Sequence, residues 1–534
     1  MKKVLLLVLT LATTLSAFAQ FAGREAGRDG SMSISELGKT ITAQELRRHL
    51  AIISSDEYEG RETGQPGQKK AAAYIAGYFE SLGLPKIGED DSYFQKISFI
   101  SESWNNIELV INGETPKHLW DYYALPATNG NQKRLKVDEV TFLGYGIDSD
   151  NYSDYKGENV KDKVILIYDG EPFGKDSISQ VTGTAGPSEW STDFRKKLRV
   201  AKEKGVKAVL IIDTDFKQNL RNARRFILNS GLDMGWGENA AENYANNYFI
   251  SSALAKMIVG DEFKKVVKAR KKMQKRGRSK AIDLKVSIEM EQDKKVRQLI
   301  GENVLGFIEG TDAELKDEIV IVSAHYDHIG MRGEEIFNGA DDNGSGTSTL
   351  LEICQTFVDA KKNGMGPRRS VLVMLVSGEE KGLLGSKYYV EHPLFPLENT
   401  VADVNVDMVG RVDKKHIDNP NYIYVIGSNR LSTDLHRINE EANARYTQLE
   451  LDYTYNAEND PNRYYYRSDH YNFAEKGIPS IFYFNGTHED YHRPSDTIEK
   501  INFEKMEKIA RLVFYTTWEL ANRDERIKVD VPQK

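Results

Sequence analysis

Five short segments of the sequence have side chains that bind metal ions or transfer protons. They are His-Tyr-Asp-His at 325–328, Gly-Ala-Asp-Asp-Asn-Gly-Ser-Gly at 339–346, Gly-Glu-Glu at 378–380, Asp407, and His-Glu-Asp-Tyr-His at 488–492. Each motif alone is common in polar turns. Together they offer at least two histidines and three carboxylates without a thiol, and such a set suits two divalent ions, zinc best of all.

The spacing inside these motifs predicts a division of roles. An aspartate two residues after a histidine can accept the second ring N–H of that histidine and fix its tautomer. A carboxylate with both oxygens free can bridge two cations about 3.5–4 Å apart. Two adjacent glutamates at the end of a strand point in different directions, so one can bind metal while the other acts as general base on a water molecule.

Apolar runs typical of buried strands precede four of the five segments. They are Ile319–Ala324, Ser370–Ser377, Val401–Val406 and Ser480–Phe484. Helical periods alternate with these runs, which predicts an α/β fold with a mixed, largely parallel sheet and helices on both faces. Ligands of such sheets bind beyond the carboxyl ends of the strands, so the five segments should meet in one crevice. Cys354 lies on the apolar stripe of one helix and is expected in the core.

The chain of 534 residues is long enough for at least two large domains. Residues 36–100 and 297–525 have the pattern of the α/β sheet, whereas residues 105–292 form short β-like runs separated by turn residues. We therefore predict a catalytic domain that is interrupted by a β-rich domain. The basic stretch Lys264–Lys280 inside the interruption is interpreted as a solvated helix end.

The composition is that of a globular protein, with 40% hydrophobic and 28% charged residues. The net charge of −8 argues against a nucleic-acid partner. Residues 1–19 have the pattern of a signal peptide: a basic start, an apolar run too short to span a bilayer, and Ala17-Phe18-Ala19 at the cleavage site. We expect a protein exported to the periplasm or the extracellular space, without a stable membrane anchor. Its oligomeric state stays open.

In their order along the chain, these motifs resemble those of the co-catalytic dizinc exopeptidases of clan MH, which include secreted bacterial leucyl aminopeptidases and glutamate carboxypeptidases. The resemblance implies two Zn²⁺ ions and five ligands: His325, Asp342, Glu380, Asp407 and His492. It also implies that Asp342 bridges the ions and is joined to Asn343 by a cis peptide bond. By the same resemblance, Asp327 orients His325 and Glu379 is the general base.

Three segments of the interruption, at 140–147, 160–167 and 201–211, resemble a protease-associated (PA) domain. In this family of enzymes such a domain is inserted near the rim of the active site. The resemblance therefore implies that residues 105–292 are a PA domain within a catalytic domain of the zinc exopeptidase fold.

The resemblance implies an exopeptidase that cleaves peptides with a metal-activated water, most simply an aminopeptidase. Two enzyme alternatives remain open: a carboxypeptidase or dipeptidase of the glutamate carboxypeptidase type, and an acyltransferase resembling glutaminyl cyclase. A binding protein of the receptor type is disfavoured, because such relatives have lost ligands that this chain retains. The candidates for substrate binding are Arg411, Tyr466, Arg467 and His470. An arginine that holds a free carboxylate would favour the carboxypeptidase.

Overall fold

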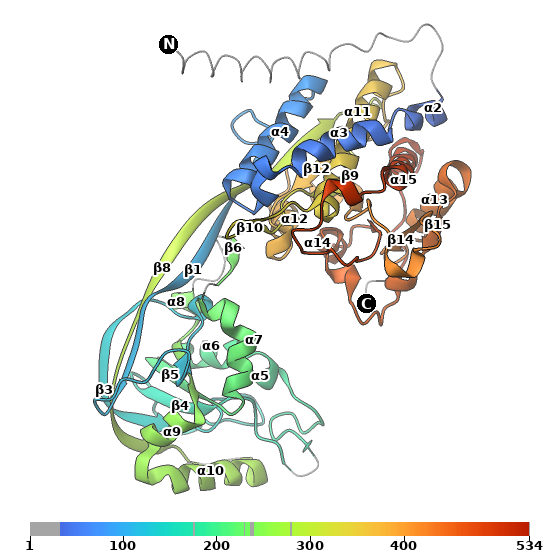
Figure 1. Cartoon of the computed structure of the whole chain (residues 1–534). Helices are drawn as coiled ribbons and strands as arrows, with labels where there is room; N and C mark the ends of the chain where they lie inside the picture. Colours follow the sequence, from blue (N-terminus) through green and yellow to red (C-terminus); the bar gives the residue numbers. More distant parts are fainter. Residues whose placement is uncertain (1–32, 175–176, 229, 235–239, 278–279, 533–534) are drawn as a thin grey trace, which may run out of the picture. The chain divides into compact units, whose positions relative to one another are not determined.

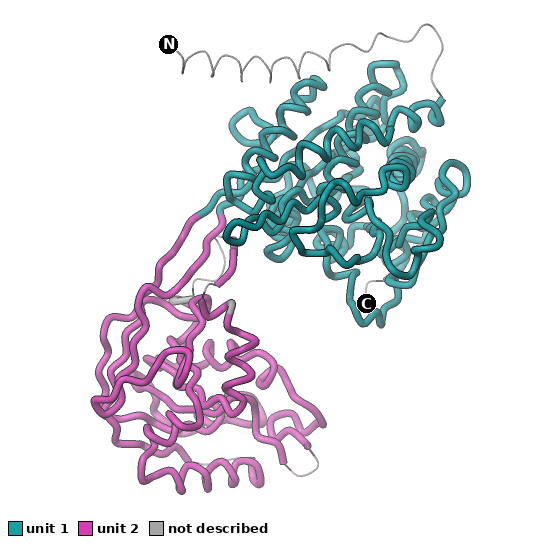
Figure 2. Tube along the Cα trace, in the orientation of Figure 1, with its two compact units in different colours: residues 1–98, 299–534 teal, residues 99–298 magenta. Residues whose placement is uncertain are grey.

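The computed structural model of the chain describes residues 33–174, 177–228, 230–234, 240–277 and 280–532 (Figure 1). The predicted signal peptide at 1–19 lies outside the described residues. The chain divides into two compact units, one from residues up to Ser98 and from Leu299 onward, the other from Phe99 to Gln298 (Figure 2). Among the described helices, none is long and apolar enough to cross a membrane.

Three helices begin the described part of the first unit. They are α2 (Ile34–Lys39), α3 (Ala43–Ile53) and α4 (Pro66–Leu82). Ser33 and Glu36 form a reciprocal capping box that starts α2. Gly83 ends α4 with a φ of 78°, a left-handed conformation that glycine adopts without steric cost. The apolar faces of α3 and α4 are buried in the same core as the central strands.

The sheet of the first unit is mixed and largely parallel, as predicted. Its strand order is β15 (Glu450–Asp452), β14 (Tyr422–Ile426), β16 (Ser480–Phe484), β13 (Thr400–Val406), β9 (Ile319–His325), β12 (Ser370–Val376) and the last residues of β8 (Ile282–Ile308). β9 lies between β12 and β13 and is parallel to both, and β13 is parallel to β16. β8 and β14 run antiparallel to β12 and β16.

Helices cover both faces of this sheet. The remaining long elements are α11 (Gly346–Lys362), α12 (Leu384–Glu391), α13 (Thr433–Ala442), α14 (His470–Glu475) and α15 (Phe503–Asn522). On β9, Val320 and Val322 belong to the core that contains residues of α11, α13 and α15, whereas Ile319 and Ile321 belong to the core with residues of α12 and α14. Cys354 is fully buried in the first of these cores, as predicted.

The second unit has apolar cores of its own. Beside β8, the strand order continues with β3 (Gln132–Phe142), β4 (Val164–Tyr168), β5 (Ala208–Asp213), β7 (Asn246–Ser251) and β2 (Tyr122–Tyr123). Separately, β1 (Phe94–Ile111) pairs with β6 (Leu232–Met234). The helices of the second unit are α5 (Glu189–Thr192), α6 (Arg195–Glu203), α7 (Phe216–Leu228), α8 (Ala240–Asn243), α9 (Ser252–Val259) and α10 (Phe263–Arg276). Val164 and Ile165 of β4 enter different apolar clusters, so both faces of this sheet are covered. That this unit is a PA domain stays a prediction.

Candidate metal centre

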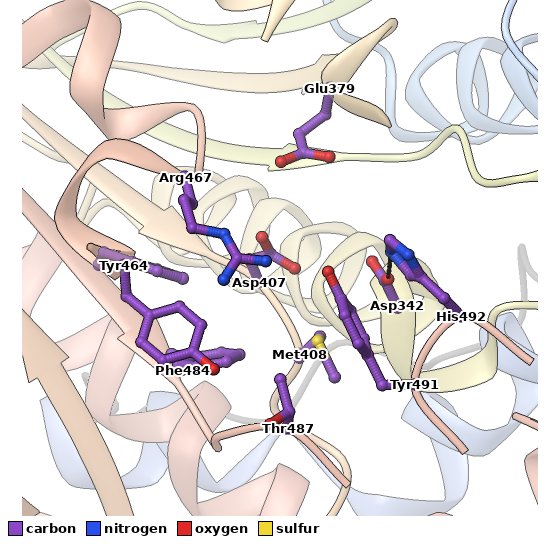
Figure 3. A pocket seen from close by; sticks show the side chains of 11 residues that line it. Asp342, Glu379, Asp407, Met408, Tyr464, Arg467, Phe484, Thr487, Tyr491 and His492 are labelled. Atoms are coloured by element: carbon purple, nitrogen blue, oxygen red, sulfur yellow. Dashed lines mark ion pairs between the residues drawn. The ribbon is translucent and has the colours of Figure 1, made fainter. Parts of the chain in front are cut away.

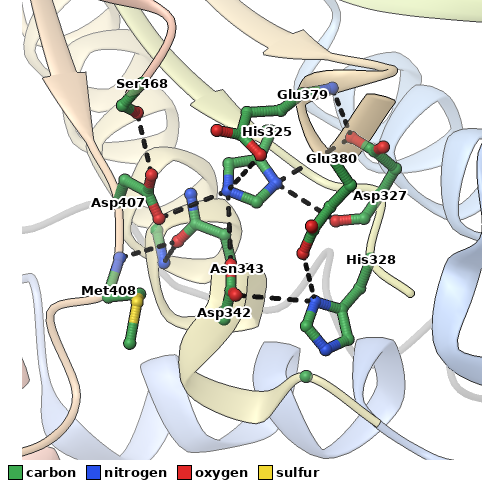
Figure 4. A network of polar contacts seen from close by, with 12 residues as sticks. His325, Asp327, His328, Asp342, Asn343, Glu379, Glu380, Asp407, Met408 and Ser468 are labelled. Atoms are coloured by element: carbon green, nitrogen blue, oxygen red, sulfur yellow. Dashed lines mark hydrogen bonds and ion pairs between the residues drawn. The ribbon is translucent and has the colours of Figure 1, made fainter. Parts of the chain in front are cut away.

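The predicted metal-binding side chains meet at the carboxyl ends of the parallel strands, and Figure 4 labels all of them except His492. His325 is the last residue of β9, Asp407 directly follows β13, and Glu379 and Glu380 follow β12. The remaining two predicted ligands are Asp342, in the turn before α11, and His492, in the segment after β16. Because β9 lies between β12 and β13, the ends of these strands are adjacent in space.

A first cluster forms around His325, whose side chain is fully buried. Its Nε2 atom lies 3.2 Å from Oδ1 of Asp407 and 3.5 Å from Oδ1 of Asp342. These three side chains could hold one metal ion. Glu379 stands at the edge of this cluster, with its Oε2 atom 3.9 Å from the same Nε2 atom.

A second cluster forms on the other oxygen of Asp342. Its Oδ2 atom lies 3.1 Å from Nε2 of His492, and that nitrogen lies 3.4 Å from Oε1 of Glu380. The ring of His328 also faces this cluster, and His328, Asp342 and Glu380 form a second triad that could hold a metal ion. Asp342 thus offers one oxygen to each cluster, and its peptide bond to Asn343 is cis, as the resemblance implied.

The charges of this region fit a divalent cation. Asp342, Glu379 and Asp407 approach one buried imidazole within 4 Å. Burial raises the pKa of Glu379 well above its usual range, and the charges of Asp407 and Glu380 raise it further, whereas His325 opposes the shift. Several carboxylates buried so close together need positive charge beside them. Bound metal ions would supply that charge, and the imidazole and carboxylate donors are ligands that zinc accepts.

Asp327 contacts His325 through its backbone. The carbonyl oxygen of Asp327 lies 3.1 Å from Nδ1 of His325, whereas its carboxylate oxygen Oδ1 lies 3.8 Å away. The carboxylate instead accepts hydrogen bonds from the hydroxyl of Thr63 at 2.6 Å and from the backbone N–H of Glu379 at 3.3 Å. The residue therefore fixes the ring of His325 and the backbone of Glu379 at the same time.

Two side chains outside the five segments contact the predicted ligands. Asp496 accepts the backbone N–H groups of Asp341 and Asp342 at 3.1 Å. Ser468 donates its hydroxyl to Oδ2 of Asp407 at 2.8 Å. The sequence contains no signal for the atom that Ser468 contacts.

A cavity opens at these clusters (Figure 3). Its lining residues are Asp342, Glu379, Asp407, Met408, Tyr464, Arg467, Phe482, Phe484, Thr487, Tyr491 and His492. Three of these residues are carboxylates, and aromatic side chains together with Met408 form most of the remaining wall. Burial raises the pKa of Tyr491, as do the carboxylates nearby, so its hydroxyl stays protonated.

Of the four substrate-binding candidates, Arg467 alone is among the described residues that line this cavity. Its guanidinium lies over the ring of Tyr464, 4.9 Å from the centroid. The other three have contacts elsewhere. Arg411 is paired with Asp490 at 2.9 Å, Tyr466 packs on Tyr471 with 4.9 Å between the ring centroids, and His470 stacks on Phe482 at 4.8 Å. Burial lowers the pKa of His470 to about 3.

Residues 303–517 match the model of peptidase family M28. A probable leucine aminopeptidase of Trichophyton verrucosum is 34% identical over 213 residues, which are 38% of this chain and 55% of that protein. Aminopeptidase YwaD of Bacillus subtilis is 28% identical over 234 residues, 42% of this chain and 46% of that one. The chain therefore spans about half the length of the curated relatives it matches.

The fold has a solved counterpart in an aminopeptidase from Aneurinibacillus sp. strain AM-1. The two share a TM-score of 0.51 and 20% sequence identity, over 94% of this chain and 100% of that one. This likeness concerns the fold. All five predicted ligands lie inside residues 303–517, the region of the chain that matches peptidase family M28.

Proposed function

We propose that the chain is a zinc-dependent exopeptidase, and within that class an aminopeptidase that removes N-terminal residues from peptides. The observation behind the proposal is that Asp342 stands between two clusters of metal-binding side chains, with Glu379 beside them. The names of the relatives, probable leucine aminopeptidase and aminopeptidase YwaD, support the aminopeptidase.

The proposal includes two zinc ions per chain. His325 and Asp407 would hold one ion, His492 and Glu380 the other, and Asp342 would serve both. When bound, such ions polarise a carbonyl group and make water reactive at neutral pH. A cyclase of the glutaminyl type would use a single ion, so the position of Asp342 between two clusters favours the peptidase.

Glu379 is the proposed general base. Its carboxylate lines the cavity and is within 4 Å of His325, while Glu380 belongs to the second cluster. From this position Glu379 can take a proton from the attacking water and return it to the leaving amine. Tyr491 lines the same cavity with a protonated hydroxyl, which can donate a hydrogen bond to the oxygen that gains negative charge.

A carboxypeptidase is the second candidate, and Arg467 is the observation that favours it. Its cationic group lines the cavity and could bind the carboxylate of a C-terminus. Amino-acid anilides and N-blocked peptides, tested on the same preparation, decide between the two: hydrolysis of anilides only supports the aminopeptidase, and hydrolysis of N-blocked peptides only supports the carboxypeptidase.

Two further parts of the proposal rest mainly on sequence. Residues 1–19 have the pattern of a signal peptide, which supports export. The PA assignment rests on the three matching segments at 140–147, 160–167 and 201–211, which all fall within the second compact unit.

Two single substitutions test the assignment of the base. Glu379→Gln should keep both zinc ions and near-native KM while lowering kcat by a factor on the order of 10²–10⁴, the usual contribution of an acid–base group. Glu380→Gln should weaken zinc binding, because it removes a charged ligand. Zinc content and kcat are measured on both variants, with Glu391→Gln, at the exposed end of α12, as the control.

Opposite results for the two variants would reverse the assignment: loss of zinc in Glu379→Gln, and slow turnover with full zinc in Glu380→Gln. Wild-type behaviour of both would show that neither glutamate takes part in the reaction.

A further inference from the structure

His328 is a second histidine of the first motif and faces the second cluster (Figure 4). Its side chain is fully buried. Its Nδ1 atom lies 2.9 Å from Oε1 of Glu380 and 3.8 Å from Oδ2 of Asp342. These are the same two oxygen atoms that Nε2 of His492 approaches, at 3.4 Å for Glu380 and 3.1 Å for Asp342.

The contact between His328 and Glu380 does not have the geometry of a hydrogen bond. Within the described part of the chain, neither ring nitrogen of His328 has a hydrogen-bond partner, and Oε1 of Glu380 also lacks one. Buried polar atoms of this kind are rare and call for an explanation. Two metal-binding atoms that face each other without a hydrogen bond between them have the orientation of two ligands of one metal ion.

The distances agree with this explanation. Two ligands of a tetrahedral zinc ion, each about 2.0–2.1 Å from the metal, are about 3.3 Å apart. The four distances between the two nitrogens and the two oxygens of the second cluster are 2.9, 3.1, 3.4 and 3.8 Å. They bracket the value that a common central ion requires.

We infer that His328 is a ligand of the second metal ion, together with His492, Glu380 and Asp342. The inference rests on the proposed function, because it assumes that the chain binds two ions. It adds a sixth ligand to the five that the family motifs indicate.

The added ligand makes the two sites unequal. The first has three protein ligands, His325, Asp342 and Asp407, the number found in catalytic zinc sites that keep one position open. The second has four, the number found in closed sites. Its two imidazoles also favour zinc over manganese or magnesium. The second site should therefore bind the first equivalent of zinc.

The backbone around His328 is fixed independently of the ring. Its N–H donates to the carbonyl of Arg61 at 3.2 Å. A Cβ atom on Gly339 would lie 2.5 Å from the ring, so the ring fills its space tightly. Phenylalanine keeps a planar ring in this space and removes both nitrogens, so His328→Phe is the appropriate substitution.

The test is a titration of metal-free protein with zinc, read by competition with a fluorescent chelator. The matched control is His470→Phe, which replaces another fully buried histidine without a hydrogen bond to either ring nitrogen among the described residues. We expect two binding steps in the wild type and in His470→Phe. In His328→Phe the tighter step should weaken more than 100-fold and the weaker step should persist.

Loss of an outer partner of a metal ligand costs roughly 10–100-fold in affinity. A change within that range or below it in His328→Phe would refute the ligand and leave His328 as a positioning residue for Glu380. X-ray absorption of the zinc-loaded wild type gives an answer that does not depend on the folding of a variant. Three imidazoles for two zinc ions support the inference, and two refute it.

These outcomes separate the inference from the proposed function. A wild-type protein that binds no zinc would refute the proposed function and the inference with it. A wild-type protein with two zinc ions, and a His328→Phe variant with unchanged affinities, would refute the inference alone.

Discussion

Replacement of Arg61 should loosen the metal centre although Arg61 binds no metal. Its side chain is fully buried, and its guanidinium donates to four backbone carbonyls. They belong to Ile53 at 2.9 Å, Tyr326 at 2.8 Å, Asn338 at 2.6 Å and Gly339 at 2.9 Å. Tyr326 lies between His325 and Asp327, and Gly339 lies just before the turn that contains Asp342. One side chain therefore fixes the spacing of two loops that contain predicted ligands.

The size of the effect follows from these contacts. Arg61→Met would remove the hydrogen-bond donor of four backbone carbonyls. Each lost hydrogen bond to a buried carbonyl lowers the free energy of unfolding by about 1–3 kcal/mol. This loss of stability is reduced because the folded protein no longer has to bury the charge of Arg61. Burial lowers the pKa of Arg61 to about 10, although nearby carboxylates, Asp342 most of all, oppose the shift. A shift of that size corresponds to roughly 3 kcal/mol for burying the charged group. We therefore expect Arg61→Met to lower the free energy of unfolding by about 1–9 kcal/mol. Arg61→Lys, which keeps the charge but fewer donors, should fall between this variant and the wild type.

Unfolding is followed by scanning calorimetry, and zinc affinity by competition titration. Zinc binding should weaken about 10–100-fold in Arg61→Met, the range found for outer partners of metal ligands. The control is Arg437→Met on α13, whose side chain is 52% exposed and paired on the surface with Asp434. If Arg61→Met unfolds within 1 kcal/mol of the wild type and binds zinc equally well, the four carbonyl contacts do not support the loops, and the reasoning fails.

Two further predictions concern the metal and the second unit. Removal of zinc by a chelator should lower the Tm of the protein. Addition of zinc at 100 times its Kd should then raise the free energy of unfolding by about 2.7 kcal/mol per site. A Tm that the chelator leaves unchanged would mean that no ion is bound. Asp154 is buried, and burial raises its pKa to about 6 against three hydrogen bonds that lower it. Because this pKa exceeds the unfolded value near 3.9, the folded state binds more protons, and the stability contributed by Asp154 is present below about pH 4 and lost as the pH rises through 6. The difference in unfolding free energy between wild type and Asp154→Asn should change by roughly 3 kcal/mol between pH 4 and 7, and a difference independent of pH would contradict the shift.

The strands that position the site could be predicted because they are buried on both faces. Such strands read as continuous apolar runs, and the run Ser480–Phe484 has the same bounds as β16. The run Val401–Val406 differs from β13 (Thr400–Val406) by one residue. The long strands β1 and β8 could not be predicted in this way, because exposed and partly buried residues interrupt their apolar pattern, as the burial of residues 282–308 shows.

The chemistry of the site was predictable where it depends on residue type at the end of a strand. It was not predictable where it depends on backbone atoms. Arg61 contacts carbonyl oxygens, which every residue has, so nothing in the sequence marks its partners at Tyr326 and Asn338. His328 stood in a motif that the sequence indicated, but spacing alone could not tell a second ligand from a polar turn.

Hydrogen bonds explain how two aspartates of the same centre come to have different roles. Asp407 directs Oδ1 to His325, while its Oδ2 atom accepts the hydroxyl of Ser468, which in turn accepts the amide N–H of Asn405 at 2.8 Å. One oxygen of Asp407 is thus occupied, which leaves it a single free oxygen for a metal ion. Both oxygens of Asp342 instead face imidazole nitrogens, at 3.5 Å for His325 and 3.1 Å for His492. Asp342 is therefore the carboxylate that can serve two ions, and the difference comes from the neighbouring groups and not from the residue type.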